Sequence, residues 1–151
     1  MYSEMDRLFV KVSRVKGMDF EMPKRSTKYS AGYDFTNPEE VVIEPNKIVY
    51  VKTGIKANMY RNEALILANR SSNPKKKGLV LANGIGLIDA DYYNNPDNEG
   101  EIAFAFMNIT SEPITLVAGE KLGQGFFIEY LVTEGDEADG ERKSGFGSTG
   151  V

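Results

Sequence analysis

The apolar residues of this 151-residue chain fall in short runs that are separated by turn-forming residues. Residues 102–109 alternate most clearly, with Ile102, Phe104 and Phe106 on one face of the expected strand. No stretch keeps a long helical stripe, so helix is limited to a turn or two, at about residues 72–76. Many short strands at this spacing predict an all-β sandwich, barrel or jelly roll. The expected strands are 8–12, 41–43, 48–55, 64–68, 79–82, 102–109, 114–117 and 126–132.

The character of the chain changes near its C-terminal end. Residues 134–141 are acidic, contain glycine and lack large apolar side chains, which is typical of a mobile linker. The basic pair Arg142-Lys143 follows, and then Phe146 within a cluster of Gly, Ser and Thr. These residue types can grip a phosphorylated ligand, although a disordered tail is the alternative for such a segment alone. We expect one domain at 1–133 and a mobile C-terminal arm at 134–151.

Composition removes several kinds of chemistry. The chain has no cysteine and no histidine, which excludes thiolate zinc sites, Cys nucleophiles and Ser-His-Asp triads. Acid–base chemistry must therefore use Asp, Glu, Lys or Tyr. The formal net charge of −4 disfavours broad nucleic-acid binding, so a phosphate ligand must be held by local groups. No apolar run approaches the ~20 residues that span a bilayer, and no secretory signal is visible, so we expect a cytoplasmic protein without a membrane partner.

Two polar segments stand next to expected strands. Asn69-Arg70-Ser71-Ser72 places an arginine and two hydroxyls where they can cradle an anion, although a capped turn explains this segment better when it is read alone. Asn83-Gly84 between two apolar strands predicts a β-hairpin. Asp89 lies in an apolar strand, where an unpaired carboxylate is costly, so it is either a satisfied structural group or a catalytic base. Asp91 and Tyr92 directly behind it favour the catalytic interpretation.

Together these segments resemble the five ordered motifs of the trimeric dUTPases of bacterial or phage type. The resemblance runs from Ala31 to Gly150. It implies an all-β, distorted jelly-roll barrel with little helix that assembles as a homotrimer with shared active sites. It also implies hydrolysis of dUTP to dUMP and pyrophosphate, which limits uracil incorporation into DNA and supplies dUMP for thymidylate synthesis. The motifs are Ala31-Gly32-Tyr33-Asp34-Phe35, Arg70-Ser71-Ser72, Asn83-x5-Asp89-x-Asp91-Tyr92, Gly119-Glu120-Lys121-Leu122-Gly123-Gln124, and Arg142 with Gly145-Phe146-Gly147-Ser148-Thr149-Gly150.

The resemblance implies a role for each candidate residue. Asp89 would deprotonate the water that attacks the α-phosphorus, once desolvation raises its basicity, with Gln124 beside the α-phosphate. Tyr92 would pack under the deoxyribose and leave no room for a 2′-hydroxyl. Supporting residues would be Asp34 and Asp91. The uracil would be read by the hairpin residues Asn83, Gly84, Ile85, Leu87 and Ile88. The phosphates would be held by Arg70, Ser71 and Ser72, and the tail would add Arg142, Phe146, Gly147, Ser148 and Thr149.

The family also uses Mg²⁺, so this cofactor is expected, held chiefly by the substrate phosphates rather than by a protein cage. Three departures from the family pattern stand out. Lys143 follows Arg142 where glycine is usual, so either cation could hold the terminal phosphate. Ser72 stands where glycine is common. About six extra residues follow Tyr92, and this loop at 93–99 is expected to be exposed and is a candidate contact for a protein partner.

Two other functions fit part of the sequence. A related deaminase of dCTP shares the expected fold and the handling of a triphosphate, but it would need a carboxylate placed to work on the base. The segment Asp89-x-Asp91-Tyr92 and the tail residue Phe146 favour the dUTPase. A regulatory protein with a nucleotide-gated binding surface is the non-enzymatic alternative. The presence of every catalytic element argues against binding as its sole activity.

Overall fold

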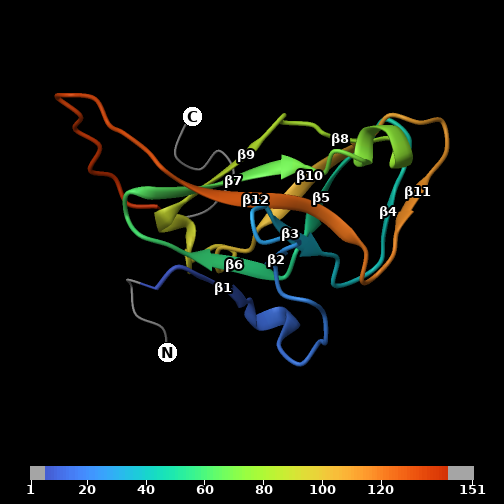
Figure 1. Cartoon of the computed structure of the whole chain (residues 1–151), viewed down its shortest axis with the longest axis horizontal. Coiled ribbons are helices and arrows are strands. Elements are labelled where there is room, and N and C mark those ends of the chain that lie inside the picture. The colour runs from blue at the N-terminus through green and yellow to red at the C-terminus, as the bar shows by residue number, and fades with distance from the viewer. Residues whose placement is uncertain (1–5, 143–151) are drawn as a thin grey trace.

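The computed structural model describes residues 6–142, and this part of the chain is nearly all β-structure (Figure 1). Short helical turns are η1 (Ser13–Val15), η2 (Asn73–Lys77) and η3 (Ala90–Tyr92). The expected all-β class is therefore confirmed. The strands are β1 (Leu8–Lys11), β2 (Lys24–Arg25), β3 (Tyr33–Thr36), β4 (Val41–Ile43), β5 (Ile48–Lys52), β6 (Ile55–Asn58), β7 (Glu63–Asn69), β8 (Leu79–Leu81), β9 (Gly86–Asp89), β10 (Ala103–Asn108), β11 (Ile114–Leu116) and β12 (Lys121–Glu129).

Antiparallel pairing joins these strands into small sheets around one core. The largest sheet has the order β2-β3-β12-β7-β9, and the next has the order β5-β10-β8. Two-stranded sheets, β1-β6 and β11-β4, complete the described part of the chain. Figure 1 shows β7 and β12 side by side along the long axis, with η2, β4 and β11 gathered at one end. This arrangement of short antiparallel strands is the distorted jelly roll that the family resemblance implied.

The core is built around aromatic rings from two sheets. Phe35 of β3 meets Phe104 of β10 edge-on with ring centroids 5.4 Å apart, and Phe104 stacks on Phe106 at 5.8 Å. Such pairs add to the free energy gained by burying their apolar surface. β12 passes directly over these rings, because a Cβ atom at Gly123 would lie 2.4 Å from Cε1 of Phe104. A glycine at this position therefore lets the two sheets close on each other.

Most expected strands are present, and the differences have local causes. The run 48–55 forms two strands instead of one, because the chain turns at Gly54, which has φ +73°. The last strand begins at Lys121 and not at residue 126, since its first half carries glycines and a glutamine instead of an apolar pattern. The same lack of an apolar pattern explains why β3 was not predicted. The helical turn expected near residues 72–76 is confirmed as η2.

The predicted hairpin around Asn83-Gly84 is wrong, although a tight turn does form there. Gly84 has φ +76°, and its N–H donates to the carbonyl of Leu81 at 3.0 Å. The two flanking strands do not pair with each other, because β8 pairs with β10 and β9 pairs with β7. The turn therefore carries the chain from one sheet to the other. The sequence signal identified the turn but could not reveal that each strand has a longer partner elsewhere.

The segment after β12 leaves the sheets. Residues 130–142 extend beyond the end of β12 and return toward β9 and η3, as Figure 1 shows in orange and red. The boundary at residue 133 and the mobility of the arm stay predictions. Phe146, Gly147, Ser148 and Thr149 lie outside the described residues. Within residues 6–142, no helix is long and apolar enough to cross a membrane.

Candidate active site

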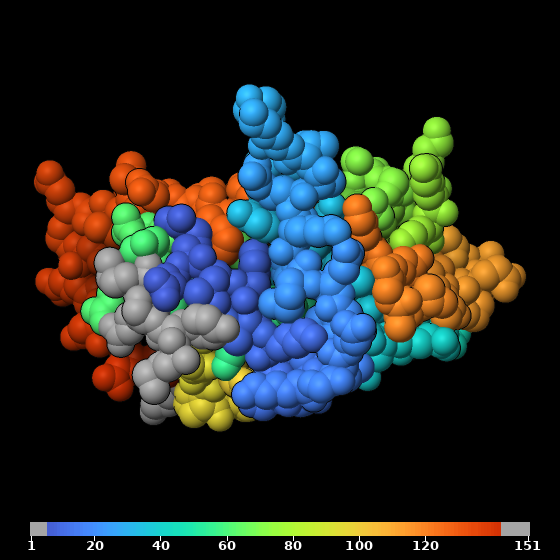
Figure 2. All heavy atoms as spheres, turned by 60° about the horizontal axis from the view of Figure 1, so that its bottom comes forward, coloured from blue at the N-terminus to red at the C-terminus, as the bar shows by residue number. Residues whose placement is uncertain are grey.

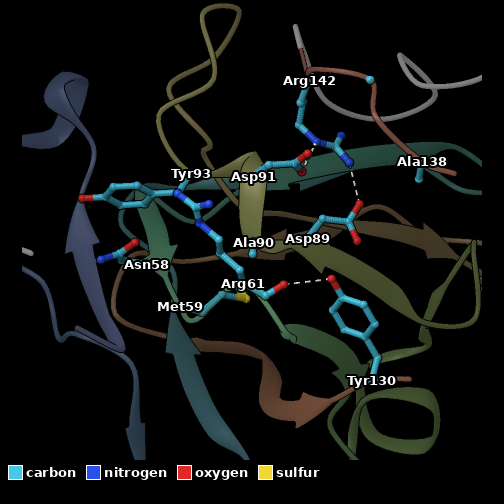
Figure 3. Close-up of a pocket in the computed structure, with 11 residues that line it drawn as sticks. Asn58, Met59, Arg61, Asp89, Ala90, Asp91, Tyr93, Tyr130, Ala138 and Arg142 are labelled. Carbon is cyan, nitrogen blue, oxygen red and sulfur yellow. Dashed lines mark hydrogen bonds and ion pairs between the residues drawn. The ribbon is translucent and has the colours of Figure 1, made fainter. Parts of the chain in front are cut away.

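A pocket of about 730 Å³ opens at the end of β9 (Figure 3). Its walls come from the turn between β6 and β7, from η3 and from the segment after β12. Figure 3 shows two carboxylates and an arginine gathered on one side, with Tyr130 on the other. The pocket is lined by Asn58, Met59, Arg61, Asp89, Ala90, Asp91, Tyr93, Tyr130, Ala138, Gly140 and Arg142.

Asp89 is the last residue of β9, and its carboxylate faces this pocket. Nη2 of Arg142 donates to Oδ2 of Asp89 at 2.5 Å, and Nε of Arg142 donates to Oδ1 of Asp91 at 2.8 Å. The Asp89 side chain is 45% exposed, whereas that of Arg142 is only 11% exposed. The desolvation that the sequence predicted for Asp89 is therefore not supplied by the described part of its own chain. A ligand that displaced Arg142 would meet both carboxylates.

Tyr92 lies behind these groups and is only 4% exposed. Its hydroxyl donates to the carbonyl of Glu101 at 2.7 Å and accepts from Nδ2 of Asn98 at 2.8 Å. Burial raises the pKa of Tyr92, so the phenol stays protonated as a hydrogen-bond donor near neutral pH. The guanidinium of Arg142 lies 5.9 Å from the centre of its ring. Arg142 therefore contacts the Asp89 carboxylate and also lies near this ring.

The candidate phosphate-binding residues gather at the other end of β7. Arg70, Ser71 and Ser72 follow this strand directly, just before η2. Gln124 lies beside them, because it is the cross-strand partner of both Ala68 in β7 and Asp34 in β3. Nε2 of Gln124 donates to the carbonyl of Asn69 at 3.1 Å, and Nζ of Lys121 lies 3.3 Å from Oδ2 of Asp34. The structure thus brings together the residues of three separate motifs.

The length of β7 separates these two groups within one chain. Ala64 of β7 is the cross-strand partner of Asp89, whereas Arg70 follows the last residue of the same strand. Six residues at about 3.3 Å each place Asp89 and Arg70 roughly 20 Å apart along the strand. The turn at 83–85 lies toward the Arg70 end of β7, since Gly86, the first residue of β9, pairs with Leu67 and the chain before it runs on past Leu67. One chain therefore carries two separate groups of candidate site residues.

The turn residues differ in how they could meet a ligand. Asn83 and Gly84 are exposed, as are the side chains of Ile85 and Leu87. Ile88 is buried and belongs to the core cluster, so only its backbone could contact a base. The loop at 93–99 was expected to be exposed, and Asn94, Pro96 and Asp97 are, but Asn95 is buried and Asn98 is half-buried.

Sequence reasoning missed several pocket residues. Arg61, Tyr93 and Tyr130 line the pocket, and the hydroxyl of Tyr130 donates to the carbonyl of Arg61 at 2.9 Å. These residues come from segments far apart in the sequence and form no motif, so no local signal could identify them. The two hydrogen bonds on the Tyr92 hydroxyl were also missed, although the many asparagines after Tyr92 indicated a loop rich in side-chain hydrogen bonds.

Residues 18–150 match the protein-family model for dUTPase. The deoxyuridine 5′-triphosphate nucleotidohydrolase of Lactococcus lactis is 49% identical, over 96% of this chain and 98% of that protein. The corresponding protein of Desulfitobacterium hafniense (strain DSM 10664 / DCB-2) is 35% identical, over 97% of this chain and 99% of that protein. The crystal structure of dUTPase from Streptococcus mutans is 44% identical, with a TM-score of 0.78 over 83% of this chain and 98% of that one. The matched residues include both groups of candidate site residues, and this chain belongs to the dUTPase family.

Proposed function

We propose that this protein hydrolyses dUTP to dUMP and pyrophosphate, with Asp89 as the general base. The observation that carries the proposal is the place of Asp89, whose carboxylate faces an open pocket in a chain without histidine or cysteine. A carboxylate at that position can hold a water molecule and take its proton as the water attacks the α-phosphorus. The curated relatives named above carry the same activity in their names.

In this proposal Arg142 leaves Asp89 when the substrate binds. The guanidinium contacts Asp89 and lies near the Tyr92 ring, in the region where the sugar and the attacking water would lie. An arginine forms forked, charge-assisted bonds with phosphate as well as with carboxylate. It can therefore exchange the two aspartates for the terminal phosphate of dUTP. The Tyr92 ring then faces the deoxyribose, and the exposed turn at Asn83 meets the uracil.

We further propose that the active sites are shared between copies of the chain in a homotrimer. Asp89 and Arg70 lie roughly 20 Å apart along β7, so the phosphate-binding group that completes each site would come from a neighbouring copy. The outer face of β5 and β10 is suited to such contact, since Ile48 and Tyr50 are 54% and 53% exposed. A hollow of about 400 Å³ on this face is lined by Tyr50, Lys52, Asn98, Glu101 and Ala103. Large exposed apolar side chains such as Ile48 and Tyr50 are typical of a surface that a partner covers.

Mg²⁺ would reach this site together with the substrate. Asp89 and Asp91 are the carboxylates that line the pocket, and within residues 6–142 no three acidic side chains gather in a cluster that could hold a metal. This donor set fits an ion that takes most of its ligands from the phosphates and water. The ion would supply neutralising charge to the triphosphate, which an acidic protein of net charge −4 needs. A protein partner at the loop 93–99 stays a prediction.

One set of assays tests the proposed function. Release of pyrophosphate is measured from dUTP, UTP, dTTP and dCTP in parallel, with and without Mg²⁺. We expect dUTP to be hydrolysed far faster than the other three nucleotides and only with Mg²⁺ present. Conversion of dCTP to a uracil nucleotide, without release of pyrophosphate from dUTP, would assign the protein to the deaminase class instead.

A further inference from the structure

The loop that follows Tyr92 is a network of side-chain hydrogen bonds around two asparagines. Oδ1 of Asn95 accepts from the backbone N–H groups of Asp97 and Asn98, at 3.0 and 3.2 Å. Nδ2 of Asn95 donates to the carbonyl of Tyr92 at 2.9 Å and to Oδ1 of Asn98 at 2.7 Å. Oδ1 of Asn98 also accepts from the N–H of Gly100 at 3.1 Å. A backbone N–H can only donate, so these contacts fix which way each amide points.

The orientation of Asn98 has one consequence for Tyr92. Since Oδ1 of Asn98 is held by two donors, its Nδ2 group is the end that points at the Tyr92 hydroxyl. The Glu101 carbonyl can only accept, so the hydroxyl gives its own hydrogen to Glu101 and receives one from Asn98. The far end of the Tyr92 ring is thereby tied at two points, which fixes the tilt of the ring.

The outside of the loop is anchored to the rest of the barrel. Nζ of Lys56 donates to Oδ1 of Asn94 at 2.5 Å and to Oε2 of Glu99 at 2.7 Å. Glu99 also accepts from the backbone N–H and the hydroxyl of Ser13. Figure 2 shows the loop in yellow on the surface beside the blue N-terminal segment. The loop therefore has the fixed position that a support for Tyr92 requires.

The loop also passes very close to the backbone of Tyr92. Gly100 has φ +88°, and a Cβ atom there would lie 2.6 Å from the carbonyl oxygen of Tyr92. Only glycine adopts this conformation and permits this approach without strain. The position of Gly100 brings Asn98 within reach of the Tyr92 hydroxyl. The local backbone and the hydrogen bonds therefore hold Asn98 in the same place.

We infer that Asn98 is a positioning residue that sets how strongly the enzyme prefers a deoxyribose to a ribose. The inference rests on the proposed function, in which the Tyr92 ring forms the floor under the sugar. A steric block against one added hydroxyl works only if the blocking ring cannot tilt away. Asn98 supplies that constraint from the extra loop without touching the substrate.

A double-mutant cycle tests this inference. The ratio of kcat/KM for dUTP to kcat/KM for UTP is measured for the full-length protein and for Asn98→Ala, Tyr92→Phe and the double variant. We expect Asn98→Ala and Tyr92→Phe each to lower the ratio about 3- to 10-fold, as coupled neighbours do, and the double variant to match either single one. Asp97→Ala is the matched control, because Asp97 lies in the same loop with an exposed side chain. Oligomeric mass is compared for every variant.

Titration of Tyr92, followed by NMR with ¹³C-labelled tyrosine, provides a second measurement. The amide of Asn98 donates to the phenol oxygen and lowers the pKa of Tyr92, so Asn98→Ala should raise that pKa further. Asp97→Ala should shift it the other way, because the Asp97 charge raises the pKa of Tyr92. A role limited to loop folding would leave the discrimination ratio unchanged or would make the two substitutions additive, and either result overturns the inference. Should Asn98→Ala fail to fold, an unchanged ratio in Tyr92→Phe overturns it too. A wild type that hydrolyses dUTP and UTP equally would instead refute the role of Tyr92 in the proposed function.

Discussion

Replacing Asp89 with asparagine removes the proposed base while keeping nearly the same shape. A general base contributes about 10²- to 10⁴-fold to the rate, or about 3 to 5 kcal/mol on the barrier, so kcat should fall by at least ~10²-fold. The fold should tolerate the change, because the Asp89 side chain is 45% exposed and a substitution at such a site usually changes stability by less than about 0.5 kcal/mol. Arg142 keeps its second partner, Asp91. Binding of a non-hydrolysable dUTP analogue should therefore survive.

Asp91→Asn is the matched control for this experiment. Asp91 is bonded to the same arginine and carries the same charge, but its side chain is more exposed, at 62%. If the loss of rate came only from releasing Arg142, the two variants would lose activity equally. We expect Asp91→Asn to lose less than about 10-fold in kcat, below the range for a general base. Pyrophosphate release under saturating dUTP and Mg²⁺ measures both. A near-normal kcat in Asp89→Asn, or equal losses in the two variants, would refute the assignment of the base.

Two further predictions concern the scaffold. Gly123→Ala should lower the free energy of unfolding by about 1 to 3 kcal/mol, because the new methyl group would lie 2.4 Å from Cε1 of Phe104. Urea titrations measure this change, and Gly140→Ala is the control, since nothing lies within 4 Å of a Cβ atom there. Hydrogen bonds from Arg7 lower the pKa of Glu63 below its ordinary value of 4.5, so the ion pair adds stability above pH 4.5 and loses it as pH falls through the lowered pKa. The stability difference between wild type and Glu63→Gln should therefore shrink on acidification below pH 4.5, and a difference independent of pH would contradict this account.

The sequence predicted the strands with an apolar inner face and missed the strands without an apolar pattern. The alternation at 102–109 identified β10, because Ile102, Phe104 and Phe106 must all face the core. β3 and the first half of β12 were missed because partner strands and a close approach at Gly123, not apolar periodicity, hold them in place. The hairpin prediction failed for a related reason, since sheet partners are chosen by long-range packing that a two-residue turn signal does not contain.

In the candidate site, too, the sequence predicted what depends on neighbouring residues and missed what depends on the fold. Short motifs were enough to select Asp89, Arg70 and Gln124, because each motif is contiguous. Their spacing in three dimensions was not predictable, since it depends on which end of β7 each segment meets. The contact of Arg142 with Asp89, across 53 positions of sequence, and the tie between Asn98 and Tyr92 likewise required the fold.

Reassembly of two inactive variants tests most directly the central claim that each dUTP site takes Asp89 and Arg70 from different chains. Asp89→Asn and Arg70→Ala subunits are unfolded together in equal amounts and refolded, and formation of mixed trimers is verified by native mass spectrometry. If neighbouring copies complete each site, about a quarter of the sites in a random mixture will combine an intact Asp89 with an intact Arg70. Pyrophosphate release from dUTP should then return to about a quarter of the wild-type rate. Mixed trimers as inactive as the parent variants would show that both residues must come from the same chain, and the shared-site account would be wrong.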